Sequence, residues 1–236
     1  MDIIKIRYCF DLDSRRREVF SLHLDSQKLE LINDPDINLP DWTKLEFHKC
    51  SHCPLNSDVT PRCPVAVNLM NVIERFEDVN SYDQIYLEVV TDERKVSQRT
   101  TAQQGISSLL GLLFASSGCP HTNFLKPMAR FHLPLATEEE TIYRATGMYL
   151  LAKYILRSEG KIANLELAGL QKIYDNLHTL NTSIADRVRS ATEADSSANA
   201  VVLLDMLAHL VPIAIDDRLE EIQHLFESYL SDTSRD

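Results

Sequence analysis

The sequence predicts an α+β fold, in which an N-terminal antiparallel sheet with one helix and a Cys-rich loop is followed by a C-terminal helical bundle. Over the first third of the chain, apolar and polar residues alternate, which is the period of strands with one face on a core. From about residue 100 onward, apolar residues recur every three or four positions, as in packed helices. We therefore expect an α+β lobe (1–95) and a helical lobe (96–236) that form one compact unit.

The N-terminal lobe is predicted to begin with a meander of three strands, near residues 4–10, 20–24 and 29–31. Pro64 suits the first position of a helix, because its missing N–H group costs nothing there. Helical spacing of apolar residues continues after it, and strand alternation returns over residues 82–91. This order predicts a sheet packed against one helix.

The helical lobe is predicted from apolar spacing and from capping residues. Residues 106–115 form a dense apolar helix, and Thr137 with Glu140 has the spacing of a capping box at the start of a long helix. Asn164 is expected to cap the next helix, and Asp195 to begin an almost continuously apolar one at the centre of the bundle. A last helix is expected near the C-terminus.

Composition excludes several classes of function. The 236 residues carry 24 Lys and Arg against 35 Asp and Glu, a net charge of −11, which argues against binding to nucleic acid or to an anionic membrane. We see neither a secretory leader nor an apolar run near the roughly 20 residues that span a bilayer. We therefore expect a cytoplasmic protein, where clustered cysteines indicate metal or redox chemistry more often than disulfides.

A cysteine-rich stretch over residues 48–64, H-K-C-S-H-C-P-L-N-S-D-V-T-P-R-C-P, is the main chemical signal. Cys50 and Cys53 have Cys-x-x-Cys spacing, with which two thiolates can bind one ion from a tight turn. Cys63 returns after a loop and supplies a third thiol. A buried structural role for the cysteines, as small apolar side chains, is the simpler alternative.

A fourth ligand would complete a tetrahedral metal site. We favour Cys119, which would give a set of four cysteines and join the two lobes, and His48 or His121 are the alternatives. Zinc is the expected ion. An iron–sulfur cluster is the alternative, because Cys53, Cys63 and Cys119 each precede a proline, as in cluster-binding loops. A closed site of four thiolates has no open position for substrate, so it predicts a structural or regulatory role.

Cys119 also suggests a different function. If the thiol lay at a helix N-terminus beside His121, its pKa would fall, and Lys126 and Arg130 could hold an anionic ligand. The chain would then be a thiol enzyme or redox sensor. The simpler interpretation is that both cations are surface or ion-paired groups. A third hypothesis is a protein-interaction module without chemistry.

One polar pair interrupts the apolar helix expected after Asp195. Asp205 and His209 are one turn apart, which suits a general-base pair or a second shell to a metal. The simpler interpretation is an internal hydrogen-bonded cluster with arginines of the preceding helix, such as Arg187 and Arg189.

Three motifs carry a resemblance to a known family. They are C-P-L…C-P-V-A-x-N-L (53–69), S-G-C-P-H-T-x-F-L-K-P-M-A-R-F-H-L-P (117–134) and E-T-I-Y-R-A-T (140–146). The sequence resembles an uncharacterised bacterial family, a domain of unknown function, over nearly its whole length. No activity is established for that family, so the resemblance implies no mechanism, cofactor or partner.

Overall fold

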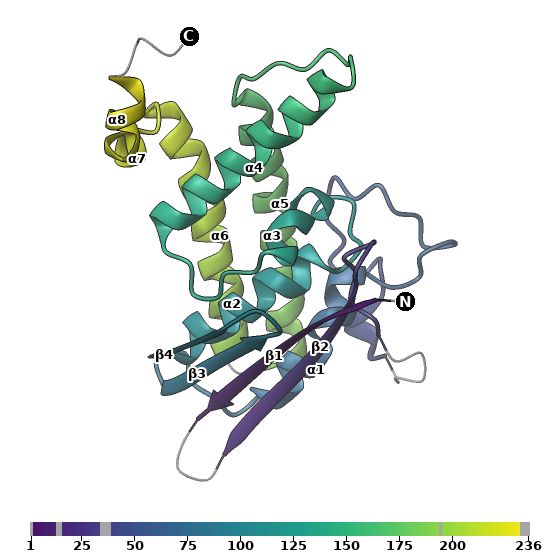
Figure 1. Ribbon diagram of the computed structural model, residues 1–236. Helices are drawn as coiled ribbons and strands as arrows, with labels where there is room; N and C mark the ends of the chain where they lie inside the picture. The colour runs from purple at the N-terminus through teal and green to yellow at the C-terminus, as the bar shows by residue number, and fades with distance from the viewer. Residues whose placement is uncertain (1, 13–15, 34–38, 194, 232–236) are drawn as a thin grey trace. The chain divides into compact units, whose positions relative to one another are not determined.

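The structure is a computed structural model that describes residues 2–12, 16–33, 39–193 and 195–231. Within them a four-stranded antiparallel sheet comes first and helices follow, so the predicted α+β class is confirmed (Figure 1). The chain divides into two compact units, Met1–Leu135 with Asn176–Asp205, and Ala136–Asp175 with Met206–Asp236. This division differs from the boundary expected at residue 95, because residues 96–135 and 176–205 also belong to the first unit.

The sheet of the first unit has the strand order β2-β1-β3-β4. Every pairing is antiparallel, and Tyr8 on the central strand β1 lies opposite both Phe20 and Val89. Alternate residues of β1 face the core, as the period of two requires. The strands are β1 (Ile3–Asp11), β2 (Arg17–Asp25), β3 (Gln84–Thr91) and β4 (Lys95–Thr101).

Three of the predicted strands are present, and two details of the predicted sheet are wrong. The third meander strand is absent from the described residues, where Leu31 makes only an isolated bridge to Leu24. β4 was not predicted, because its side chains are mostly polar and exposed and so lack an apolar period.

Helices α1 (Pro64–Arg75) and α2 (Ala102–Ala115) cover the sheet. Pro64 occupies the first turn of α1, as predicted, and Cys63 is its N-cap. α2 approaches the sheet closely at Gly105, where a Cβ would lie 2.8 Å from Cδ1 of Ile85. Two short helices then follow, η2 (Asn123–Leu125) and α3 (Lys126–Arg130).

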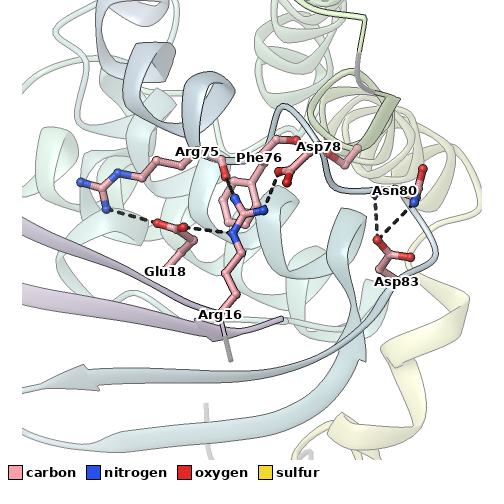
Figure 2. Close-up of polar contacts among 8 residues, drawn as sticks. Arg16, Glu18, Arg75, Phe76, Asp78, Asn80 and Asp83 are labelled. Carbon is pink, nitrogen blue, oxygen red and sulfur yellow. Dashed lines mark hydrogen bonds and ion pairs between the residues drawn. The ribbon is translucent and has the colours of Figure 1, made fainter. Parts of the chain in front are cut away.

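An ionic network on the surface of the first unit joins the start of β2 to the end of α1 (Figure 2). The guanidinium of Arg16 lies 3.2 Å from Glu18 and 2.5 Å from Asp78, and it also donates to the carbonyl of Arg75. Arg75 in turn donates to the carbonyl of Val19 over 2.7 Å. Arg16 therefore satisfies a carbonyl at the end of α1, where helical carbonyls lack partners within the helix.

The second unit contains α4 (Glu138–Ser158), whose predicted capping box between Thr137 and Glu140 is present. Long helices α5 (Ala168–Ala191) and α6 (Asp195–Asp216) each contribute residues to both units. The C-terminal part consists of short helices, which are α7 (Glu220–Gln223), η3 (His224–Phe226) and α8 (Glu227–Leu230).

Three predictions for the helices are wrong. α5 begins at Ala168 rather than at Asn164, whose side chain instead accepts a hydrogen bond from the Glu166 N–H. The last helix is not one α-helix but a succession of short ones, α7, η3 and α8, and the positive φ angles of Arg218 (54°) and Leu219 (59°) separate this succession from α6.

The expectation that α6 is surrounded on all sides is also wrong, since Val202, Met206 and Ile213 are exposed on it. The expectation that no apolar run approaches bilayer length does not hold for α6, which by length and composition alone could cross a membrane. Core helices of soluble proteins pass the same test.

Candidate metal centre

The four thiols predicted as ligands come from three places in the first unit. Cys50 and Cys53 lie on the loop that follows η1 (Asp41–Thr43), and the N–H of Cys53 donates to the carbonyl of Cys50 over 3.0 Å, closing a turn. Cys63 lies at the end of the same loop, as the N-cap of α1. Cys119 lies in the irregular segment after α2. The structure therefore gathers residues that are up to 69 positions apart in sequence.

These four thiols are near one another, and none of the cysteines in the described chain is in a disulfide. Cys119 interacts electrostatically with Cys63, Cys50 and Cys53. Among the described residues, no three of the sulfur atoms all lie within 4.8 Å of one another. Tetrahedral zinc–thiolate coordination would bring sulfurs to about 3.8 Å, so the thiols are clustered but do not stand at coordination distances.

Burial makes two of these thiols hard to ionise. It raises the pKa of Cys119 to about 12, and it also raises the pKa of Cys50. A buried thiolate therefore needs a compensating cation. For Cys119 this direction is opposite to that expected for a nucleophile at a helix N-terminus. The thiol precedes a turn closed by Thr122, whose N–H donates to the Cys119 carbonyl over 3.0 Å.

Arg187, on α5, is a charged group whose place beside the cysteine loop no sequence pattern predicts. Its side chain is buried, at 1% exposure. Its Nη1 donates to the carbonyls of Trp42 and Lys44 over 2.5 and 2.7 Å, and Nη2 donates to that of Leu45 over 3.4 Å. These bonds hold the segment that leads into the cysteine loop. The Nε of Arg187 is buried without a hydrogen-bond partner among the described residues.

The titratable neighbours of Arg187 are cysteines. Desolvation lowers its pKa, and Cys63, Cys50 and Cys53 act in the opposite direction. Within the described part of the chain, its hydrogen bonds go to carbonyls rather than to a carboxylate. A positive charge is therefore buried where negative charge on the thiols would stabilise it.

The two histidines considered as a fourth ligand use one ring nitrogen elsewhere. Nε2 of the exposed His48 lies 3.2 Å from the Ser190 hydroxyl. Nε2 of His121 lies 3.0 Å from the carbonyl of His52, and the two imidazole rings stack at 3.8 Å. Cys119, by contrast, interacts electrostatically with all three other thiols. This arrangement favours Cys119 over either histidine.

Lys126 and Arg130, expected as an alternative anion site, both contact carboxylates. Nζ of Lys126 lies 2.8 Å from Glu30, and Nη1 of Arg130 lies 3.3 Å from Glu93. These contacts favour the simpler interpretation of paired charges.

Two hydrogen-bonded histidines lie outside the thiol cluster. Nε2 of His132 contacts the hydroxyl of buried Tyr8, which is also 3.1 Å from the Ser108 hydroxyl, and burial raises the pKa of Tyr8. Nδ1 of His178 lies 2.9 Å from Oδ1 of Asp205. Neither pairing follows from sequence spacing, because each joins residues that do not lie in the same element.

Fold and cluster together define an α+β protein with four cysteines beside a buried arginine. The chain belongs to the family described as Domain of unknown function (DUF6901), which matches residues 5–227. The family membership expected from the sequence motifs is thus confirmed. Neither a curated protein nor a solved structure matches the chain.

Proposed function

We propose that this chain is a metal-binding protein, in which Cys50, Cys53, Cys63 and Cys119 hold a zinc ion. The thiolate set is the soft donor set that zinc prefers, and it comes from a Cys-x-x-Cys turn, a helix N-cap and a second loop. Metal binding would draw the sulfurs together from their present separation. The proposed role is structural or regulatory, because four protein ligands leave no coordination position for a substrate.

The observation that carries this proposal is the charge balance around Arg187. Four thiolates and one Zn²⁺ have a net charge of −2, and a buried guanidinium reduces it to −1. Without ionised thiols, the same guanidinium is a buried cation whose described partners are neutral carbonyls. Such a charge is costly unless it is compensated, which supports a site that is anionic when loaded.

An iron–sulfur cluster is the alternative occupant. It would use the same four cysteines, three of which precede a proline. Both occupants require reduced thiols before assembly, which agrees with the cytoplasmic location we propose. The two differ in colour, because zinc–thiolate sites do not absorb visible light and iron–sulfur clusters do.

Metal analysis of anaerobically purified protein tests the proposal. We expect about one zinc per chain in the wild type and loss of metal in Cys50→Ser and Cys119→Ser. Cys9→Ser is the matched control, because Cys9 is buried on β1 outside the cluster and its variant should keep the metal. Circular dichroism of each variant separates loss of metal from loss of fold.

Cobalt provides a second readout. Co²⁺ bound by four thiolates gives intense thiolate-to-metal absorption, which should weaken in the Cys50 and Cys119 variants and remain in Cys9→Ser. A wild-type protein that contains no stoichiometric metal and takes up no Co²⁺ under reducing conditions would overturn the proposal. A brown protein with stoichiometric iron would replace zinc by a cluster at the same residues.

A further inference from the structure

One face of α4 in the second unit carries an exposed apolar stripe. Tyr143, Leu151 and Tyr154 are 53%, 59% and 67% exposed, and the ring of Tyr143 also lies 6.3 Å from that of Phe226 in η3. With Gly147 they lie at intervals of four, four and three residues, so they share one face of the helix. Large apolar side chains gathered on one exposed helical face indicate a surface that packs against another protein.

Gly147 lies at the centre of this stripe and near the middle of the helix. It is exposed, and a Cβ added to it would meet no atom of the described chain within 4 Å. Glycine in an exposed helix interior lowers helix stability relative to alanine, and nothing within the described chain uses the space it leaves. A small residue at the centre of a helical face allows a second helix to approach closely.

Charge along α4 is divided between its two ends. Glu138, Glu139 and Glu140 lie in the first turn, and Arg157 lies in the last turn. Residues 139 and 157 fall on the same flank of the stripe, given 3.6 residues per turn. Within the chain, the exposed carboxylate of Glu139 lies 4.0 Å from Nε2 of His224. When two copies of α4 run antiparallel about Gly147, Glu139 of one copy therefore lies beside the partner's Arg157.

We propose that α4 is a homodimer interface, at which a second copy of this chain packs antiparallel with the two helices crossing at Gly147. Tyr143 then faces the partner's Leu151, and two symmetric Glu139–Arg157 pairs flank the crossing. The two-fold arrangement brings opposite charges together, although the whole chain carries a net charge of −11. A parallel arrangement would place acidic ends beside acidic ends. This proposal is independent of the thiol site.

Sedimentation velocity of the full-length chain over a concentration series tests the interface. The dissociation constant is expected on the order of 10 micromolar, because a single helix pair buries little surface. Gly147→Leu should weaken association about 100-fold, since its side chain fills the point of closest approach. Ala152→Leu is the matched control: it adds comparable bulk to an exposed position of α4 outside the stripe and should leave the constant unchanged.

A charge exchange tests the orientation. Glu139→Arg and Arg157→Glu should each weaken association about tenfold, and the double variant should recover wild-type affinity. Loss of helix stability in either single variant would not be repaired in the double one, so recovery identifies the intermolecular pair. A chain that stays monomeric up to about 0.5 mM, or a dimer that tolerates Gly147→Leu, overturns the proposal.

Discussion

The two units of this protein differ in one feature each, a buried charge in the first and an exposed apolar helix face in the second. In the first unit, the largest fully buried side chains include a charged one, Arg187, among aromatic and aliphatic residues such as Tyr8 and Phe76. In the second unit, large apolar side chains such as Leu151, Tyr154 and Ile162 are exposed. The first unit thus encloses a charge that needs compensation, and the second exposes apolar surface that water does not favour.

This difference indicates where each unit meets its surroundings. A buried guanidinium is stable only when groups inside the protein accept its hydrogen bonds and compensate its charge. The thiols beside Arg187 are the groups that could supply this negative charge. An exposed apolar helix face can be removed from water only by packing against another protein, which supports a partner at this face. Substitutions that exchange polar and apolar groups should therefore affect the two units differently.

The largest effect is expected for Arg187→Met. The variant removes the donors to the Trp42, Lys44 and Leu45 carbonyls, and buried carbonyls without partners are costly. We expect a loss of about 3 kcal/mol in the free energy of unfolding, reduced by the relief of a buried charge. Urea unfolding followed by the fluorescence of Trp42, the single tryptophan, measures it directly. The protein should first be treated with a chelator, so that metal does not contribute.

Leu151→Gln makes the opposite substitution in the second unit, a polar side chain in place of an apolar one. Because Leu151 is exposed, the free energy of unfolding should change by less than about 0.5 kcal/mol at low protein concentration. If Arg187→Met were equally neutral, Arg187 would not be needed to hold the loop and the contrast between the units would fail. Arg187→Lys should be intermediate, because it keeps the charge but has fewer donors.

The fold was predictable from sequence wherever one local signal decided it. The strand period of β1 and the Thr137–Glu140 capping box were both confirmed, since each depends on neighbouring residues. β4 was missed because an exposed edge strand needs no apolar alternation, and Leu31 was assigned to a strand because turns and strands share short apolar runs. The way in which distant elements pack together cannot be predicted from one sequence as the periodicity of a single strand or helix can.

The candidate site shows the same limit. Cys50, Cys53 and Cys63 were selected by spacing, and the gathering of Cys119 with them was an inference from residue type that agrees with their electrostatic interaction. The burial of Arg187 beside the cysteine loop could not be predicted, because an arginine on an amphipathic helix is ordinarily exposed. Its burial depends on three carbonyls from a segment more than 140 residues away.

Two glycines allow one substitution to be compared in both units. In Gly105→Ala, the new Cβ would lie 2.8 Å from Ile85 and 3.1 Å from the ring of Phe10, so the core must shift. We expect a loss of about 1 kcal/mol, since crowding exceeds the gain in helix propensity. In Gly147→Ala the added Cβ meets no atom of the described chain, and a gain of about 0.5–1 kcal/mol is expected.

Urea unfolding at dilute concentration, where self-association does not contribute, should give opposite signs for the two alanine variants. Equal signs would contradict the difference in packing between α2 and α4. At high protein concentration the gain in the free energy of unfolding of Gly147→Ala over the wild type should be smaller, because the proposed helix crossing needs a small residue there.

The smallest effect is expected at the surface of the first unit, in Arg16→Ala. The Arg16 hydrogen bond holds the pKa of Asp78 below its ordinary value, although the Asp78 side chain is largely exposed. A lowered carboxyl pKa adds stability above the ordinary pKa, and that stability is lost as pH falls through the lowered pKa. The melting temperature of Arg16→Ala should therefore be slightly below that of the wild type at pH 7, and the difference should shrink toward about pH 2. Arg99→Ala, which removes an exposed arginine of β4 outside this network, should show no such pH dependence. A difference that persisted in acid would mean that Arg16 acts mainly through the Arg75 carbonyl at the end of α1, since that acceptor does not titrate.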